Sequence, residues 1–78
     1  MRTDNVRLAA FLVTKGHPVQ GVEIGASGYG VLTFAEAAQA DAETYEMGGN
    51  APAEALLTNY RTLIRKIEEY KKRQGGAR

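Results

Sequence analysis

The C-terminal third of the chain carries the pattern that most limits its fold, a stripe of apolar residues at intervals of three and four. These residues are Ala53, Leu56, Tyr60, Leu63, Ile67 and Tyr70. Such spacing places side chains along one face of an α-helix, as the a and d positions of a heptad repeat do. The repeat is too short for a free coiled coil. The helix must therefore pack on the rest of its own chain or on another copy.

Self-association is favoured by the small size of the domain. The chain has 78 residues, and a domain of this length buries only about 60% of the surface of its unfolded chain. Such a domain usually gains stability from disulfides, a metal or association. We therefore predict a homo-oligomer, with a seam between subunits formed by Leu56, Tyr60, Leu63, Ile67 and Tyr70.

Disulfides and most metal sites are excluded by composition. The chain contains no cysteine, and His17 is its single histidine. Thiolate zinc sites, cysteine nucleophiles and histidine-rich metal sites therefore cannot be built within one chain. We expect no metal and no cofactor.

The N-terminal sequence TDNVRLAAFLVTKGHP predicts a helix over residues 4–15. Thr3 or Asp4 can cap its first turn. Gly16 can adopt the left-handed conformation after the last turn, and Pro18 prevents continuation of the helix.

Glycines at positions 21, 25, 28 and 30 raise the alternative of a phosphate-binding loop. A P-loop requires GxxxxGK[ST] followed by a helix, and the dinucleotide fingerprint is GxGxxG. Here the order is GxxGxG, and no lysine follows. The flanking runs, residues 18–25 and 29–34, are rich in β-branched and aromatic residues. We therefore predict an antiparallel hairpin that turns at GASG.

Two further helices complete the predicted fold. The segment 35–49 is rich in alanine and glutamate and stops at Gly48 and Gly49. Asn50 offers an N-cap and Pro52 an early-turn position for the last helix. The order α-β-β-α-α predicts an α+β fold with helices on one face of a small antiparallel sheet. We expect one domain over residues 1–74 and a frayed tail over 75–78.

Charge is divided unevenly along the chain. Residues 1–58 carry seven acidic and three basic side chains, whereas residues 59–78 carry two acidic and seven basic ones. This asymmetry predicts an acidic body and a basic end. The basic end could meet a polyanion or the acidic part of another subunit.

Arg61 and Arg65 are the strongest candidates for ligand contacts. They lie one turn apart on the last helix, where like charges repel. Two such arginines beside Tyr60 or Tyr70 could clamp a phosphate and stack a base. His17 joins this candidate set, although its place in a GHP turn also suits a structural role at terminal carbonyls.

Two alternatives remain for the same helix. Arg65, Lys66, Lys71, Lys72 and Arg73 could contact a nucleic-acid backbone. The face could instead be a solvated one with pairs at i, i+4, namely Arg65–Glu69, Glu68–Lys72 and Glu69–Arg73.

Catalysis is not expected. The sequence offers no Ser/His/Asp or Cys/His arrangement and no paired carboxylates assignable to a cleft. The longest apolar run, residues 8–13, is too short for a signal-peptide core or a membrane span. We expect a cytoplasmic protein with no membrane partner.

The chain resembles a family of small uncharacterised domains from bacteria, archaea and their phages. The similarity rests on short motifs over most of the chain: a polar pair before LA-x-[FY]-L, a Gly-His turn, a strand hairpin, a Y-x-x-G turn and Arg-x-Leu in the final helix. The matching residues are Thr3, Asp4, Leu8, Ala9, Phe11, Leu12, Gly16, His17, Tyr45, Gly48, Arg61 and Leu63. The resemblance implies a fold and a phage-linked context and assigns no catalytic residue.

These observations lead to three functional expectations. The first is a non-enzymatic, homo-oligomeric binding protein, encoded by a phage, that counters host defence by sequestering a nucleotide signal. The second is a nucleic-acid-associated accessory or regulatory protein that uses the basic helix. The third is an inhibitor directed at another protein.

Overall fold

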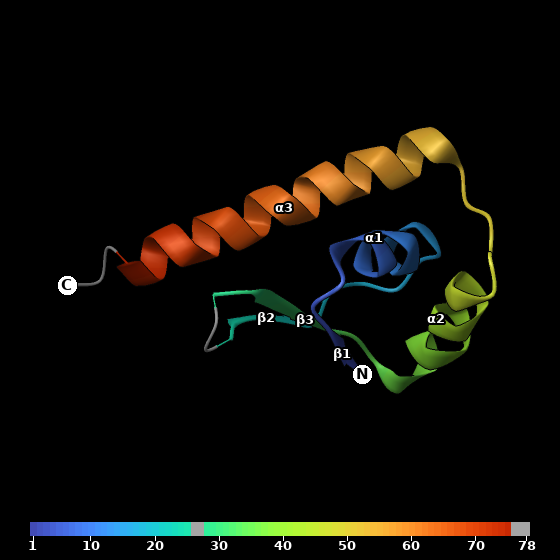
Figure 1. Ribbon diagram of the computed structural model, residues 1–78, viewed down its shortest axis with the longest axis horizontal. Helices are drawn as coiled ribbons and strands as arrows, with labels where there is room; N and C mark the ends of the chain where they lie inside the picture. Colours follow the sequence, from blue (N-terminus) through green and yellow to red (C-terminus); the bar gives the residue numbers. More distant parts are fainter. Residues whose placement is uncertain (26–27, 76–78) are drawn as a thin grey trace.

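The computed structural model describes residues 1–25 and 28–75 and has an α+β fold (Figure 1). Its elements in chain order are β1 (Arg2–Thr3), α1 (Val6–Thr14), β2 (Gly21–Ile24), β3 (Gly30–Thr33), the 3₁₀ turn η1 (Glu36–Ala38), α2 (Gln39–Glu46) and α3 (Ala53–Gly75). The predicted order of helix, hairpin and two helices is confirmed. Short strand β1 precedes it and was not predicted, because two residues show no periodicity.

The sheet has the order β1-β3-β2, and both pairs of strands are antiparallel. In the hairpin, Val22 pairs with Leu32 and Ile24 pairs with Gly30, so these four residues share one face. That face turns toward α3, because a Cβ added at Gly30 would touch Ile67. The predicted turn falls partly on residues 26–27, outside the described residues. Next to it, the Gly25 amide donates to the Tyr29 carbonyl at 2.8 Å.

Both ends of α1 are set by local sequence. The side chain of Asn5 accepts hydrogen bonds from the amides of Arg7 and Leu8, so Asn5 is the N-cap in place of the predicted Thr3 or Asp4. At the other end, Gly16 has a φ of 99°, and the His17 amide donates to the Leu12 carbonyl at 3.0 Å. This is the predicted glycine-terminated end.

The second helical segment stops in the same way as α1. Gly48 has a φ of 90°, and the Gly49 amide donates to the Thr44 carbonyl at 2.8 Å. The prediction of a stop at Gly48 and Gly49 is confirmed. The segment begins as the 3₁₀ turn η1 and becomes α-helical at Gln39.

The start of α3 differs from the prediction in its cap. The Pro52 carbonyl accepts the bond from the Leu56 amide, so Pro52 directly precedes the first helical residue. Asn50 forms no side-chain hydrogen bond with the described residues and is not the cap. The helix continues through Gly75, and residues 76–78 lie outside the described residues.

The core surrounds α1. Its residues Leu8 to Leu12 are all buried, and Phe11 and Leu12 are enclosed with Leu32 and Phe34 of the sheet region. From α3, Leu63 and Ile67 join this core. The side-chain amide of Asn59 donates a hydrogen bond to the Thr14 hydroxyl at 2.9 Å and so links α3 to α1. In the described part of the chain, no helix is both long and apolar enough to cross a membrane.

Gly30 is where the sheet approaches α3 most closely. A Cβ at Gly30 would lie 2.7–2.8 Å from three side-chain carbons of Ile67. We predict that Gly30→Ala lowers the free energy of unfolding by about 1–3 kcal/mol, the usual cost of overpacking. Urea denaturation monitored by circular dichroism measures the change.

Gly21→Ala is the matched control, because a Cβ there would meet only Thr33 atoms at 3.8 Å. It should leave stability unchanged or raise it slightly. The double variant Gly30→Ala/Ile67→Ala should lose less free energy of unfolding than the sum of the two single variants, because the shorter side chain at position 67 removes the clash. Equal losses of unfolding free energy in Gly30→Ala and Gly21→Ala would contradict the close approach of β3 to α3.

Candidate functional site

The predicted ligand residues Tyr60, Arg61 and Arg65 line one shallow hollow on α3. Ile64 and Glu68 complete it, and we call this surface the Arg61 hollow. Arg61 and Arg65 are exposed, whereas Tyr60 is half-buried. These three predicted ligand residues therefore lie on one surface of the protein.

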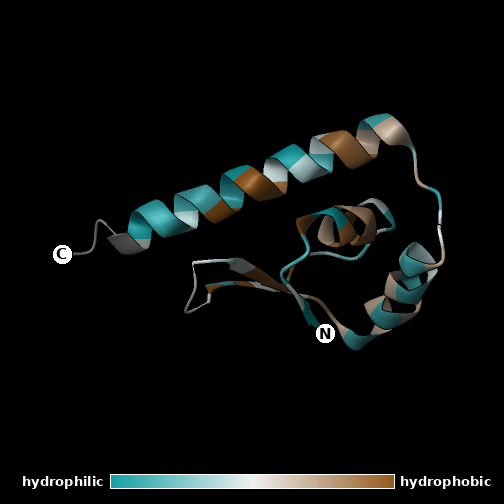
Figure 2. Ribbon diagram, in the orientation of Figure 1, coloured by the Kyte–Doolittle hydropathy of each residue, from teal (hydrophilic) through white to brown (hydrophobic). Residues whose placement is uncertain are grey.

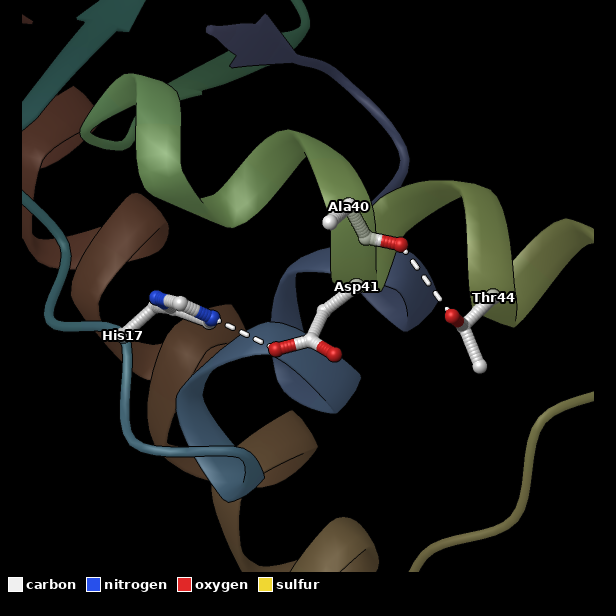
Figure 3. A network of polar contacts seen from close by, with 4 residues as sticks. All are labelled: His17, Ala40, Asp41 and Thr44. Atoms are coloured by element: carbon white, nitrogen blue, oxygen red, sulfur yellow. Dashed lines mark hydrogen bonds and ion pairs between the residues drawn. The ribbon is translucent and has the colours of Figure 1, made fainter.

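Tyr70 and His17 lie elsewhere. Tyr70 borders a separate hollow together with Val22 and Arg73, next to the sheet. The His17 ring binds the carboxylate of Asp41 on α2 at 2.7 Å (Figure 3). The sequence predicted a contact of the His17 ring with terminal carbonyls. The ring instead forms this hydrogen bond with Asp41, which links the α1–β2 loop to α2.

A second hollow that Tyr60 also lines lies between α1, α2 and α3. Its volume is about 360 Å³, within the range of small-molecule sites. We call it the Tyr45–Tyr60 hollow. Its lining consists of Arg7, Ala10, Tyr45, Ala53, Leu56, Leu57 and Tyr60.

Each wall of the Tyr45–Tyr60 hollow comes from a different helix. Ala10 of α1 is buried and forms a small-residue floor. Tyr45 of α2 is held against Phe11, with ring centroids 5.2 Å apart and planes tilted by 56°. Tyr60 of α3 supplies the second aromatic side chain. Two half-buried tyrosines thus border an apolar space.

Arg7 gives this apolar hollow a positive charge at its rim. It lies in the first turn of α1, where the positive end of the helix dipole disfavours a cation. Asp4 and Asn5 lie beside Arg7, Tyr45 and Tyr60 in the adjoining mouth of the hollow. The mouth therefore combines one guanidinium with the carboxylate of Asp4, which can accept hydrogen bonds.

The arginines of both hollows lack carboxylate partners. Over residues 1–25 and 28–75, the ion pairs within 4 Å are Arg2–Glu23 and His17–Asp41. The predicted pairs Arg65–Glu69, Glu68–Lys72 and Glu69–Arg73 do not form. The face is exposed to solvent, as that alternative expected, but these three pairs are not among the ion pairs of the described residues.

The predicted oligomer seam is largely occupied within the chain. Leu63 and Ile67 are 3% and 6% exposed and pack in the core. Leu56 and Tyr60 are half-buried and line the Tyr45–Tyr60 hollow. The apolar stripe of α3 thus packs on its own chain, which was one of the two alternatives open from the sequence.

The C-terminal end of α3 is hydrophilic and reaches past the β2–β3 hairpin (Figure 2). Lys71, Lys72 and Arg73 are all exposed there. Lys66 is also exposed and lies near Tyr70. The candidate nucleic-acid residues therefore form an accessible basic segment.

Sequence reasoning missed Arg7 and Tyr45 as site residues. Tyr45 is part of a weak apolar stripe in its own helix, and its approach to Tyr60 depends on long-range packing. Arg7 did carry a local signal, since an arginine in a first turn that contains no acidic residue is unfavourable for the helix.

The His17–Asp41 contact predicts a structural effect. We expect Asp41→Ala to lower the free energy of unfolding by about 1 kcal/mol, because a half-buried hydrogen bond is lost. For a domain of this size the melting temperature should fall by about 4–8 °C. Differential scanning calorimetry measures the shift.

Glu43→Ala is the control, because Glu43 is exposed on the same helix and has no ion-pair partner among the described residues. It should change stability by less than about 0.5 kcal/mol. Equal melting temperatures for the two variants would show that the His17 contact contributes nothing to stability.

No protein-family model matches the chain, and neither a curated protein nor a solved structure is significantly similar to it.

Proposed function

We propose that the protein is a non-enzymatic binding protein of the cytoplasm that captures a nucleotide in the Tyr45–Tyr60 hollow. The observation that carries this proposal is the combination of two tyrosines, an apolar space of about 360 Å³ and Arg7, which has no carboxylate within 4 Å in the described chain. A nucleotide has the matching chemistry, because it joins a flat base to a charged phosphate.

The roles of the side chains follow from their chemistry. Tyr45 and Tyr60 offer aromatic surfaces on which a base can stack, as in single-strand nucleic-acid proteins. Arg7 is placed to donate charge-assisted hydrogen bonds to phosphate. Asp4 can accept hydrogen bonds from sugar hydroxyls or amino groups. The Asn5 side-chain oxygen already accepts the Arg7 and Leu8 amides as the N-cap of α1.

Arg61 and Arg65 do not line this site; they line the Arg61 hollow, which shares Tyr60 with it. A ligand longer than a mononucleotide could reach both arginines around Tyr60. Sequestration of a nucleotide signal by a phage protein remains the biological role proposed for such binding.

Binding is tested with adenosine monophosphate and guanosine monophosphate by isothermal titration calorimetry. We predict that Arg7→Ala weakens binding about tenfold, since a charge-assisted hydrogen bond in an open site contributes about 1.5 kcal/mol. Tyr60→Ala should reduce the binding free energy by about 1–3 kcal/mol, the usual contribution of one stacked base. Tyr60→Phe should retain most of the affinity, because it keeps the ring.

Arg2→Ala is the matched control, because Arg2 is an exposed arginine that pairs with Glu23 away from the hollow. It should leave affinity unchanged. Native mass spectrometry of the protein as purified adds an independent readout, since a captured nucleotide increases the measured mass. Absence of binding to either probe and of any added mass would exclude the proposal.

A second candidate function is nucleic-acid binding by the basic end of α3. The observation that favours it is the exposure of Lys71, Lys72 and Arg73 without ion pairs in the described chain. Arg65 and Lys66, one to two turns earlier, extend the same segment.

If this segment binds a nucleic-acid backbone, affinity should fall steeply with salt, with a slope of about −0.7 per phosphate contact on a single strand. Fluorescence anisotropy with a labelled oligonucleotide measures this slope. Changing Lys71, Lys72 and Arg73 to alanine should make this slope shallower by about two, since three phosphate contacts are lost. Binding that is insensitive to salt would count against this function, and binding to none of these probes would favour a protein-directed inhibitor.

A further inference from the structure

A second stripe runs along α3 beside the one that packs in the core. Its members are Glu54, Leu57, Arg61, Ile64 and Glu68, again at intervals of three and four, so they share one side of the helix. Leu57 is 50% exposed, Ile64 is half-buried, and the three charged residues are exposed. We call this surface the charged stripe.

The charges of this stripe alternate along the helix. Glu54, Arg61 and Glu68 are separated by seven residues each, which corresponds to about 10 Å along the axis. That spacing is too long for an ion pair within the helix, and Arg61 has no carboxylate within 4 Å anywhere in residues 1–25 and 28–75. Leu57 and Ile64 lie between the charges and remain partly in contact with solvent.

An alternating stripe of this kind is complementary to a reversed copy of itself. Two parallel α3 helices in register would bring Arg61 against the same arginine and Glu68 against the same glutamate. Two antiparallel helices bring Arg61 opposite Glu68 twice, because a twofold interface repeats each contact. Charge therefore selects the antiparallel arrangement.

The geometry points to a second copy of this chain as the occupant of the charged stripe. We propose that two α3 helices pack antiparallel, with the twofold axis between Ile64 and Arg65. Arg61 then pairs with Glu68 of the partner subunit, and the two Ile64 side chains meet near the axis. This pairing does not depend on the proposed nucleotide binding.

The length of overlap favours this register over the other antiparallel one. Pairing Arg61 with Glu68 aligns residues 54–75 of both helices, almost the whole of α3. Pairing Arg61 with Glu54 would align only residues 53–62, because α3 begins at Ala53. Stable interfaces bury about 1,200–2,000 Å² in total, so the longer overlap is the one that can supply a dimer.

The surface buried in this way differs from the seam predicted by the heptad pattern. Leu63 and Ile67 stay in the core of each subunit, and the partner covers Leu57 and Ile64 on the adjacent side. The Arg61 hollow, which Tyr60, Ile64, Arg65 and Glu68 also line, becomes part of the interface. Arg65 lies beside the twofold axis, and the partner's Glu68 is the nearby carboxylate that can offset its charge. Leu57 and Tyr60 also line the Tyr45–Tyr60 hollow, so the partner borders that hollow on its α3 side.

Exchange of the two charges tests the pairing. Sedimentation velocity at about 50 µM protein should show a dimer for the wild type. Arg61→Glu and Glu68→Arg should each give a monomer, because each single change places like charges opposite one another. The double variant Arg61→Glu/Glu68→Arg should dimerise again, because it restores opposite charges with reversed sign.

Lys66→Glu is the control for Arg61→Glu, since it makes the same change in net charge on the opposite side of α3 and should leave the dimer intact. Thermal unfolding of each variant by circular dichroism shows that every chain is folded. A monomeric wild type would overturn the proposal. So would a dimer that survives both single changes, or a double variant that remains monomeric while folded. Nucleotide titration of the monomeric Arg61→Glu variant then reports on the Tyr45–Tyr60 hollow separately.

Discussion

Burial of α1 is the interaction on which the remaining contacts depend. Five consecutive residues, Leu8 to Leu12, are buried, so the helix is enclosed on most of its circumference and not on a single face. It contacts β1, α2 and α3. Ala9 and Ala10 have no exposed surface, and their small side chains let the neighbouring helices approach closely. β1, α2 and α3 contact this helix directly, and β3 and β2 are placed through strand pairing with β1 and contact with α3.

The candidate binding site results from the same packing of α2 and α3 on α1. α2 and α3 cover neighbouring sides of α1, and the space left between them has Ala10 as its floor and one tyrosine on each side. A larger residue than alanine at position 10 would fill this space. The hollow therefore arises where the enclosure of α1 is incomplete, and Arg7 lies at that same gap.

Signals within a few residues of each other were sufficient to predict most of the fold. Gly16 and Gly48 end their helices because both adopt positive φ, and the hairpin follows from alternating residues around glycines. The N-cap of α1 was misassigned because Thr3, Asp4 and Asn5 are adjacent residues of similar capping ability. Strand β1 forms only because β3 is available as a partner.

The site was harder to predict because it depends on distances that the sequence does not contain. Tyr60, Arg61 and Arg65 are neighbours on one helix, so their proximity follows from periodicity alone. Tyr45 and Tyr60 line the same hollow only because α2 and α3 both pack on α1. The heptad pattern likewise predicted a packed stripe correctly but could not identify its partner, which is α1 and the sheet of the same chain.

The covering of α1 by α3 also has a kinetic consequence. The hydrogen bond from Asn59 to Thr14 joins residues 45 positions apart, and Leu63 and Ile67 close the core from still later in the chain. During synthesis, α1 leaves the ribosome long before the helix that shields it. Its apolar surface is thus exposed to water or to chaperones in the nascent chain, and the domain folds only after α3 has emerged.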